Sequence, residues 1–158
     1  MKFYIKQKVF SWSDTFYVFD ELGNKLFMVK GDMFSFGKKL TILDNAENPL
    51  YRIEQEIFRF RPRYHILKNG EILATVVKEF SLFTPHYTVE GPGWEVDGDF
   101  FDHDYEITDR GRPIATVQKQ WFTWGDTYEV DVQDDSYDPI FVLAAAIIID
   151  CVLDSQDD

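Results

Sequence analysis

The feature that most constrains the fold is an apolar segment near the C-terminus. From Ile140 to Ile149 no residue is polar, so a helix here would have no polar face and would have to be enclosed by protein or by lipid. Asp138 and Pro139 precede the segment and are typical of a helix N-cap and of the first helical position. A bilayer span takes roughly 20 apolar residues, and Asp150 interrupts this run well before that length. We therefore expect an enclosed core helix and no transmembrane segment.

Composition sets further bounds. A chain of 158 residues is the size of one domain with a sizeable core, and we expect a single domain over residues 1–158. The net charge of −12 disfavours non-specific binding to nucleic acid or to anionic lipid, since both favour a positive field, and solubility is its ordinary explanation. The single cysteine, Cys151, excludes an intrachain disulfide and is expected to be a buried, inert thiol. The first residues lack the apolar region of a signal peptide, which makes a cytoplasmic location the default expectation.

Upstream of the apolar segment the sequence predicts short strands and turns. The aromatic share of 17% suits strands, and Asn69-Gly70 is the dipeptide most typical of a two-residue hairpin turn. We count roughly twelve strands of ordinary length. The clearest predicted strands are 3–8, 14–19, 25–30, 39–43, 50–53, 63–67, 72–80 and 126–132.

The predicted strands repeat. Shifted by 41 positions, the stretch 64–90 falls on 105–131 and matches at nine positions, turn glycine included. The pairs are Tyr64/Tyr105, Ile66/Ile107, Gly70/Gly111, Ala74/Ala115, Thr75/Thr116, Val76/Val117, Lys78/Lys119, Tyr87/Tyr128 and Val89/Val130. Chance similarity among strands is the alternative explanation, and the shared glycine and Val-x-Lys make it the weaker one. One hairpin unit reused around a closed sheet explains the pattern.

The helix and the repeated hairpins fit one architecture. A barrel of about eight antiparallel strands has room only for side chains, and its diameter grows with strand number. A helix with its side chains is about 10–12 Å across, so enclosing one requires a larger barrel. The predicted fold is mainly β: a closed antiparallel barrel of about twelve strands around a buried C-terminal hydrophobic helix.

Three features carry a resemblance to a known family. They are the segment Phe58-Arg-Phe-Arg-Pro-Arg-Tyr64-x-Ile66, the repeated Ala-Thr-Val-x-Lys unit, and an apolar C-terminal helix that reaches Ile-Asp-Cys. Together they resemble the LURP-one-related family, which is grouped with the tubby C-terminal-like superfamily and the phospholipid scramblases. The resemblance covers the whole chain and implies a twelve-stranded barrel around a buried helix.

The resemblance implies less about activity. Tubby proteins bind phosphoinositide headgroups through a basic pocket, and scramblases are linked to Ca²⁺ and lipid, but neither site maps onto this sequence residue by residue. The proline-rich N-terminal region and the cysteine cluster of scramblases have no counterpart here. Single-domain members of the family are mostly uncharacterised.

The candidate ligand-binding residues are Arg59, Arg61 and Arg63. If residues 58–63 form a strand, alternation places the three guanidiniums on one face and Phe58 and Phe60 on the other. Forked, planar donors of this kind suit phosphate or carboxylate groups. The alternative is a solvated face on which the arginines pair with acidic residues.

Two acidic clusters suggest metal binding, at Asp97–Asp104 and Asp131–Asp138. Neither fits an EF-hand loop: counted from Asp131, the sixth position is Ser136 and the twelfth Val142, where glycine and glutamate are required. Asp134 and Asp135 can instead favour the positive end of the helix dipole. We expect no metal and no other cofactor.

Enzyme signatures are missing from the sequence. The three histidines are scattered, and no phosphate loop, nucleophile elbow or zinc spacing is present.

Asp150 is the unusual residue, because an enclosed carboxylate is costly unless it is hydrogen-bonded or protonated. It could lie at the barrel mouth facing water or a cation, or be a buried acid that fixes the depth and register of the helix.

Two classes of function follow from these observations. The first is a non-enzymatic module that binds an anionic phospholipid headgroup or another phosphorylated ligand on its outer surface. The second is a structural or protein-interaction module acting through exposed aromatic residues such as Trp12, Trp94 and Trp124, which are more commonly core or cap residues. Nucleic acid is not an expected partner, and the sequence does not indicate an oligomeric state.

Overall fold

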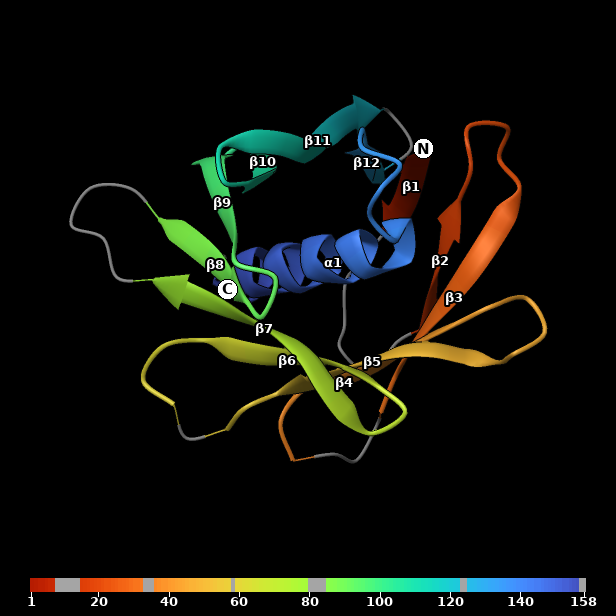
Figure 1. Ribbon diagram of the computed structural model, residues 1–158. Coiled ribbons are helices and arrows are strands. Elements are labelled where there is room, and N and C mark those ends of the chain that lie inside the picture. Colours follow the sequence, from red (N-terminus) through yellow and green to blue (C-terminus); the bar gives the residue numbers. More distant parts are fainter. Residues whose placement is uncertain (8–14, 33–35, 58, 80–84, 123–124, 157–158) are drawn as a thin grey trace.

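The computed structural model describes residues 1–7, 15–32, 36–57, 59–79, 85–122 and 125–156. Within them the chain forms twelve strands followed by one helix (Figure 1). The elements are β1 (Lys2–Gln7), β2 (Thr15–Phe19), β3 (Lys25–Gly31), β4 (Lys39–Leu43), β5 (Pro49–Gln55), β6 (Arg63–Lys68), β7 (Glu71–Glu79), β8 (His86–Glu90), β9 (Trp94–Asp99), β10 (Asp104–Asp109), β11 (Arg112–Phe122), β12 (Gly125–Val132) and α1 (Pro139–Gln156).

The strands close into an antiparallel barrel. Each strand pairs with the next in the sequence, and β1 closes the barrel by pairing with β12 on one side and β2 on the other. In such a meander the connections alternate between the two ends of the barrel. The odd-numbered strands end at one end of the barrel, here called the loop end. The turns after the even-numbered strands lie at the other, the turn end, where the chain enters α1.

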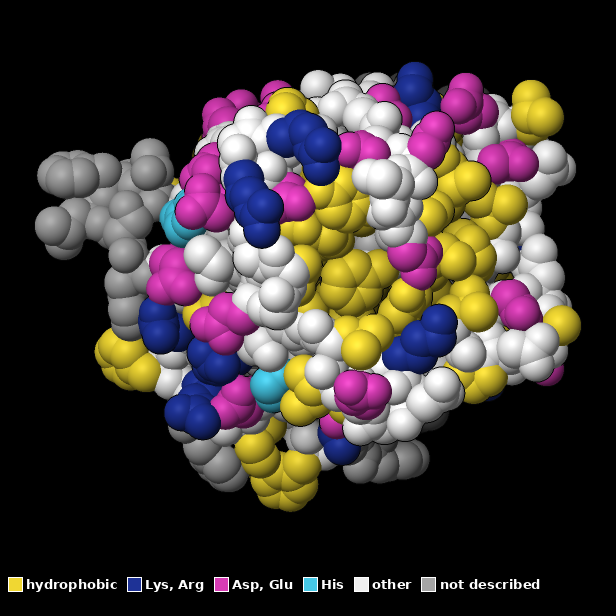
Figure 2. Space-filling model, viewed as in Figure 1, with side chains coloured by type: hydrophobic (Ala, Val, Ile, Leu, Met, Phe, Trp, Pro, Cys, Tyr) yellow, Lys and Arg dark blue, Asp and Glu magenta, His cyan; other side chains and the backbone are white. Residues whose placement is uncertain are grey.

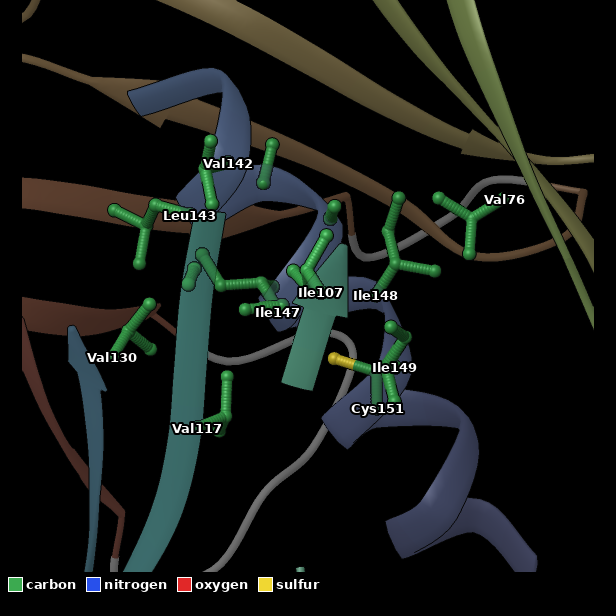
Figure 3. Packing of buried hydrophobic residues seen from close by; sticks show 14 of the residues in the cluster. Val76, Ile107, Val117, Val130, Val142, Leu143, Ile147, Ile148, Ile149 and Cys151 are labelled. Carbon is green, nitrogen blue, oxygen red and sulfur yellow. The ribbon is translucent and has the colours of Figure 1, made fainter. Parts of the chain in front are cut away.

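Helix α1 runs through the barrel (Figure 1). Every side chain from Val142 to Val152 is at most 3% exposed. Figure 3 shows Val117 and Val130 of the sheet facing Leu143 and Ile147 of the helix. The prediction of a closed barrel around a buried C-terminal helix is confirmed, and the thiol of Cys151 is buried as expected. In the described part of the chain, no helix is long and apolar enough to cross a membrane.

The repeated hairpins have the same backbone. Tyr64 in β6 and Tyr105 in β10 are both buried, and each is followed by a turn with two residues of positive φ. These are 52° and 80° at Asn69 and Gly70, and 52° and 81° at Arg110 and Gly111. Two consecutive positive φ angles match the right-handed twist of the flanking strands. The hairpin predicted at Asn69-Gly70 is confirmed, and its copy adopts the same turn with Arg110 in place of asparagine.

The predicted N-cap of α1 is also confirmed. Asp138 Oδ1 accepts a hydrogen bond from the backbone N–H of Ile140 at 3.0 Å, which satisfies a free donor of the first turn. The hydroxyl of Tyr51 in β5 donates to the other oxygen of the same carboxylate. Asp134 and Asp135 lie before the cap, outside the first helical turn. Asp134 accepts hydrogen bonds from the N–H and hydroxyl of Ser136.

One sequence expectation needs correction, and one open alternative is decided. Residues 59–62 are not part of a strand, and only Arg63 belongs to one, as the first residue of β6. Pro62 has no N–H to donate to a ladder, which accounts for the late start of the strand. Trp94 is 3% exposed and packs edge-on against Tyr137 and Phe141, so of the two alternatives it is the core or cap residue and presents no interaction surface. Phe58, Trp12 and Trp124 lie outside the described residues.

Truncating one helix side chain tests the enclosure. Ile148 is fully buried, so Ile148→Ala should lower the free energy of unfolding by about 2–5 kcal/mol through lost burial and a residual cavity. The control is Ile72→Ala, at a side chain 53% exposed on the outside of β7, which should change it by about 0.5 kcal/mol or less. Urea unfolding followed by circular dichroism measures both. Equal effects of the two variants would contradict a packed interior.

Candidate functional site

The three candidate arginines lie at the loop end of the barrel, in the connection between β5 and β6 and at the start of β6. Lys and Arg side chains alternate with Asp and Glu side chains at the lower left of Figure 2, the side on which Figure 1 places this connection. Arg59 is the most exposed of the three side chains, at 58%. The interior is filled by α1, so any ligand held by these arginines sits on the outer surface.

Each arginine contacts a glutamate. Arg59 Nε donates to Glu56 Oε1, and Arg63 Nε donates to Glu56 Oε2 at 3.1 Å. Hydrogen bonds from Arg63 and then from Arg59 hold the pKa of Glu56 below its usual value. Arg61 pairs with Glu79 of β7. The structure therefore contains the acidic pairing that the sequence offered as the alternative for these arginines.

Further hydrogen bonds hold these glutamates in position. The hydroxyl of Thr88 in β8 donates to Glu79 Oε1 at 2.9 Å. His65 Nε2 lies 3.3 Å from Glu56 Oε2, and the other ring nitrogen of His65 is 2.9 Å from the hydroxyl of Thr75. Arg63 Nη2 is also 3.5 Å from Glu90 Oε2. We call Glu56, Arg59, Arg61, Arg63, Glu79 and Glu90 the arginine–glutamate cluster.

The second polar site is buried, at the loop end of α1. Asp150 is 3% exposed, and its Oδ1 accepts a hydrogen bond of 3.1 Å from the hydroxyl of Tyr105 in β10. The same hydroxyl lies 3.1 Å from the backbone oxygen of Ala146. His103 Nδ1, from the β9–β10 connection, is 3.7 Å from Asp150 Oδ1. Asp150 is thus the buried acid of the two alternatives and does not face water at the barrel mouth.

Burial dominates the electrostatics of Asp150. Desolvation raises the pKa of its carboxyl above the ordinary value of 3.8, and hydrogen bonding from His103 and Tyr105 offsets part of this rise. Burial also raises the pKa of Tyr87, which the Asp150 charge raises further. Within the described residues, Asp150 Oδ2 and the Tyr87 hydroxyl are buried without a hydrogen-bond partner. An unsatisfied buried carboxylate oxygen favours the protonated form of the acid.

The acidic clusters do not converge on one point. Asp99 pairs in register with Asp104, and Asp97 with Glu106, across β9 and β10. His86 Nδ1 lies 2.6 Å from Asp97 Oδ1. In the described part of the chain, no three His, Cys, Asp or Glu side chains come together as metal ligands would.

Comparison with known proteins identifies the family. The family model described as LURP-one-related matches residues 1–150. The chain belongs to the LURP-one-related family. The uncharacterised protein YxjI of Bacillus subtilis (strain 168) is 32% identical over 158 residues, covering all of this chain and 97% of that protein. An Arabidopsis thaliana protein solved by X-ray crystallography has the same fold, with a TM-score of 0.66 and 18% identity over 96% of this chain and 90% of that one.

Membership of the family supports no enzymatic class, since neither the LURP-one-related description nor the YxjI name carries an activity. The resemblance found in the sequence is confirmed.

The sequence analysis singled out the three arginines and Asp150, but it missed the residues that pair with them. Glu79 is 18 positions from its partner Arg61, Glu56 is 7 positions from Arg63, and Tyr105 is 45 positions from Asp150. The repeat was the one signal that could have indicated that Tyr105 points into the barrel, because it aligns Tyr105 with Tyr64 at the same place in the hairpin unit.

The pH dependence of stability tests the buried carboxyl. Because the pKa of Asp150 is raised on folding, its stabilising contribution is complete below 3.8 and is lost as pH rises through the folded value. In Asp150→Asn the side chain at this position is uncharged at every pH. The variant should therefore gain stability relative to the parent as pH rises from about 3 to about 8, by about 1.4 kcal/mol for each unit of pKa shift. Urea unfolding at a series of pH values measures this difference.

Asp44→Asn is the control, because the pKa of Asp44 is shifted in the opposite direction. Hydrogen bonds led by the backbone N–H of Asn48 lower the pKa of Asp44, so its contribution is present above 3.8 and lost as pH falls. The Asp44→Asn variant should lose stability relative to the parent as pH rises through the acid range. Parallel pH profiles for the parent and Asp150→Asn would show that the Asp150 carboxyl titrates as it does in the unfolded chain.

Proposed function

We propose that this LURP-one-related protein is a non-enzymatic binding module that holds an anionic phospholipid headgroup, or another phosphorylated ligand, at Arg59, Arg61 and Arg63. The observation that carries the proposal is the placement of three guanidiniums on the outer surface, two in the short β5–β6 connection and one at the start of β6. The carboxylates orient them without using all their donors. A guanidinium has five N–H groups, and Arg59 and Arg61 each direct one nitrogen to a glutamate.

The paired glutamates do not exclude an anionic ligand. The Arg59–Glu56 pair is exposed, and such pairs are worth about 0–1 kcal/mol, so a phosphate group with two charges can compete for that guanidinium. Charge-assisted, bidentate contacts to phosphate are stronger than ordinary hydrogen bonds. The glutamates also restrict the cluster to strongly charged ligands, because a weak anion would not displace them.

The buried pair of His103 and Asp150 does not favour an enzymatic function. His103 and Asp150 are the buried candidates for acid–base chemistry, and they are 5% and 3% exposed. A general base must reach the proton that it removes from a substrate. Both side chains are buried inside the barrel, where a substrate cannot reach them, so they contribute to the fold more readily than to a reaction.

Reversing one charge tests the proposal. Arg61→Glu should weaken binding to phosphoinositide-containing liposomes by roughly thirtyfold, since each cation near an anionic surface contributes about 1 kcal/mol and reversal removes about two such contributions. The matched control is Arg112→Glu at the turn end, where the side chain is 64% exposed. Flotation measures liposome binding, and calorimetry with soluble inositol trisphosphate separates headgroup recognition from attachment to a bilayer.

Loss of binding with Arg61→Glu and retention with Arg112→Glu support the proposal. Equal binding by both variants and the parent would refute the arginine site. Thermal unfolding of each variant confirms that the barrel is intact, and Arg59→Glu supplies a second reversal at the most exposed arginine, where misfolding is least expected.

A further inference from the structure

Two connections lie side by side at the loop end. The backbone N–H of Gln55 donates to the carbonyl oxygen of Lys38 at 2.8 Å, and the N–H of Lys38 donates to the side chain of Gln55 at 3.0 Å. A Cβ on Gly37 would lie 2.6 Å from a methyl carbon of Ile57. The connection between β3 and β4 thus packs directly against the one that carries the arginine–glutamate cluster.

These two connections carry the opposite charge to the rest of the chain. Residues 30–39 and 56–63, which are these connections together with the ends of the strands that flank them, have a combined formal charge of +4, on a protein of net charge −12. The β9–β10 region at the same end, residues 97–104, has a formal charge of −4. The six cations of the first two segments are Lys30, Lys38, Lys39, Arg59, Arg61 and Arg63, and the two acids are Asp32 and Glu56.

Large apolar side chains project from this cationic surface. Phe60 is 92% exposed and Phe36 is 80% exposed, with Ile57 partly exposed between the same two connections. Yellow side chains extend from the edge of the molecule beside the dark blue group at the lower left of Figure 2. We call Phe36, Lys38, Ile57, Arg59, Phe60 and Arg61 the basic–aromatic edge.

Apolar residues set among cations fit one kind of partner. Segments that bind at the surface of an anionic membrane insert aromatic side chains at the headgroup–acyl boundary, while Lys and Arg contact the negative headgroups. A soluble phosphorylated ligand would use the arginines but would gain nothing from phenylalanines that point outward. The acidic remainder of the surface would be repelled by the same membrane and so would orient the protein.

We propose that the basic–aromatic edge docks onto an anionic lipid surface, with Phe36 and Phe60 entering the interfacial layer. The inference builds on the proposed function and adds the surface, the inserted residues and the orientation. The loop end on the β3–β6 side faces the membrane, and the turn end, with Asp20, Asp44 and Asp134 in its turns, faces away.

Environment-sensitive labels test the docking. Cys151 is 1% exposed, so an introduced surface cysteine can be labelled selectively with a nitrobenzoxadiazole dye. Phe60→Cys is compared with Phe101→Cys, which is equally exposed at 93% but lies in the acidic β9–β10 region. Leu22→Cys marks the turn end. The probes are phosphatidylcholine vesicles with and without phosphatidylserine.

On vesicles containing phosphatidylserine, the dye at position 60 should brighten by about twofold or more as it leaves water. The dyes at positions 101 and 22 should not respond, and neutral vesicles should give no signal at any position. Equal responses at positions 60 and 101, or none at position 60, would overturn the proposal. Unlabelled parent protein carried through the same reaction verifies that Cys151 stays protected.

A second pair of variants keeps this proposal distinct from the proposed function. Phe60→Ser should reduce binding to anionic vesicles by about fivefold or more and leave binding of soluble inositol trisphosphate unchanged, because Phe60 contributes only to insertion. Arg61→Glu should weaken both. If Arg61→Glu is harmless while the dye at position 60 responds, docking stands and the arginine site fails. If Phe60→Ser binds vesicles as the parent does, docking fails whatever the arginines do.

Discussion

The whole structure depends on enclosing a helix that has no polar face. From Val142 to Ile149 each side chain is apolar and almost completely buried, and only a surface that surrounds the helix can remove all of them from water. A closed sheet does this and leaves no exposed strand edges. The size of the helix then sets the minimum size of the barrel. Since α1 fills the interior, recognition of any ligand is left to the outer surface and the ends.

Two polar anchors complement this apolar packing. Hydrophobic contacts are non-directional, so by themselves they would tolerate a helix displaced along the barrel axis. At the N-terminal end Tyr51 of β5 donates to Asp138, and near the C-terminal end Tyr105 of β10 donates to Asp150. One phenol thus makes a directional contact to the N-cap of α1, and the other to a carboxyl group within the helix. Together they assign the helix one depth inside the barrel, at the expense of burying an acid.

Much of this architecture could be predicted from the sequence because it rests on local or periodic signals. The apolar run, the Asp138-Pro139 start and the Asn69-Gly70 turn each indicate structure within a few residues. The repeat then indicated that the hairpins now seen as β6–β7 and β10–β11 are equivalent units, which led to the prediction of a closed sheet. The long, continuous run of apolar residues was the most reliable of these signals, because its composition alone required enclosure.

The site was harder to predict because it depends on contacts between distant segments. Alternation suggested a strand for residues 58–63, but Pro62 delays β6 until Arg63. Nothing local indicated that Arg61 would meet Glu79, or that Asp150 would lie beside His103 of the β9–β10 connection. The burial of Trp94 was equally hard to predict, since an isolated aromatic residue next to a turn is compatible with a surface position and with a core position. Its contacts with Phe141 exist only once the barrel has closed.

The position of α1 after all twelve described strands has a consequence for biosynthesis. Chains emerge from the ribosome N-terminus first, at about 5–20 residues per second, so all twelve described strand segments are synthesised before the helix that fills the barrel. Until then the inward faces of the strands have nothing to pack against. The nascent protein therefore passes through an interval in which all these strand segments exist without the helix that completes the core, and only the arrival of the final segment allows the barrel to close around it.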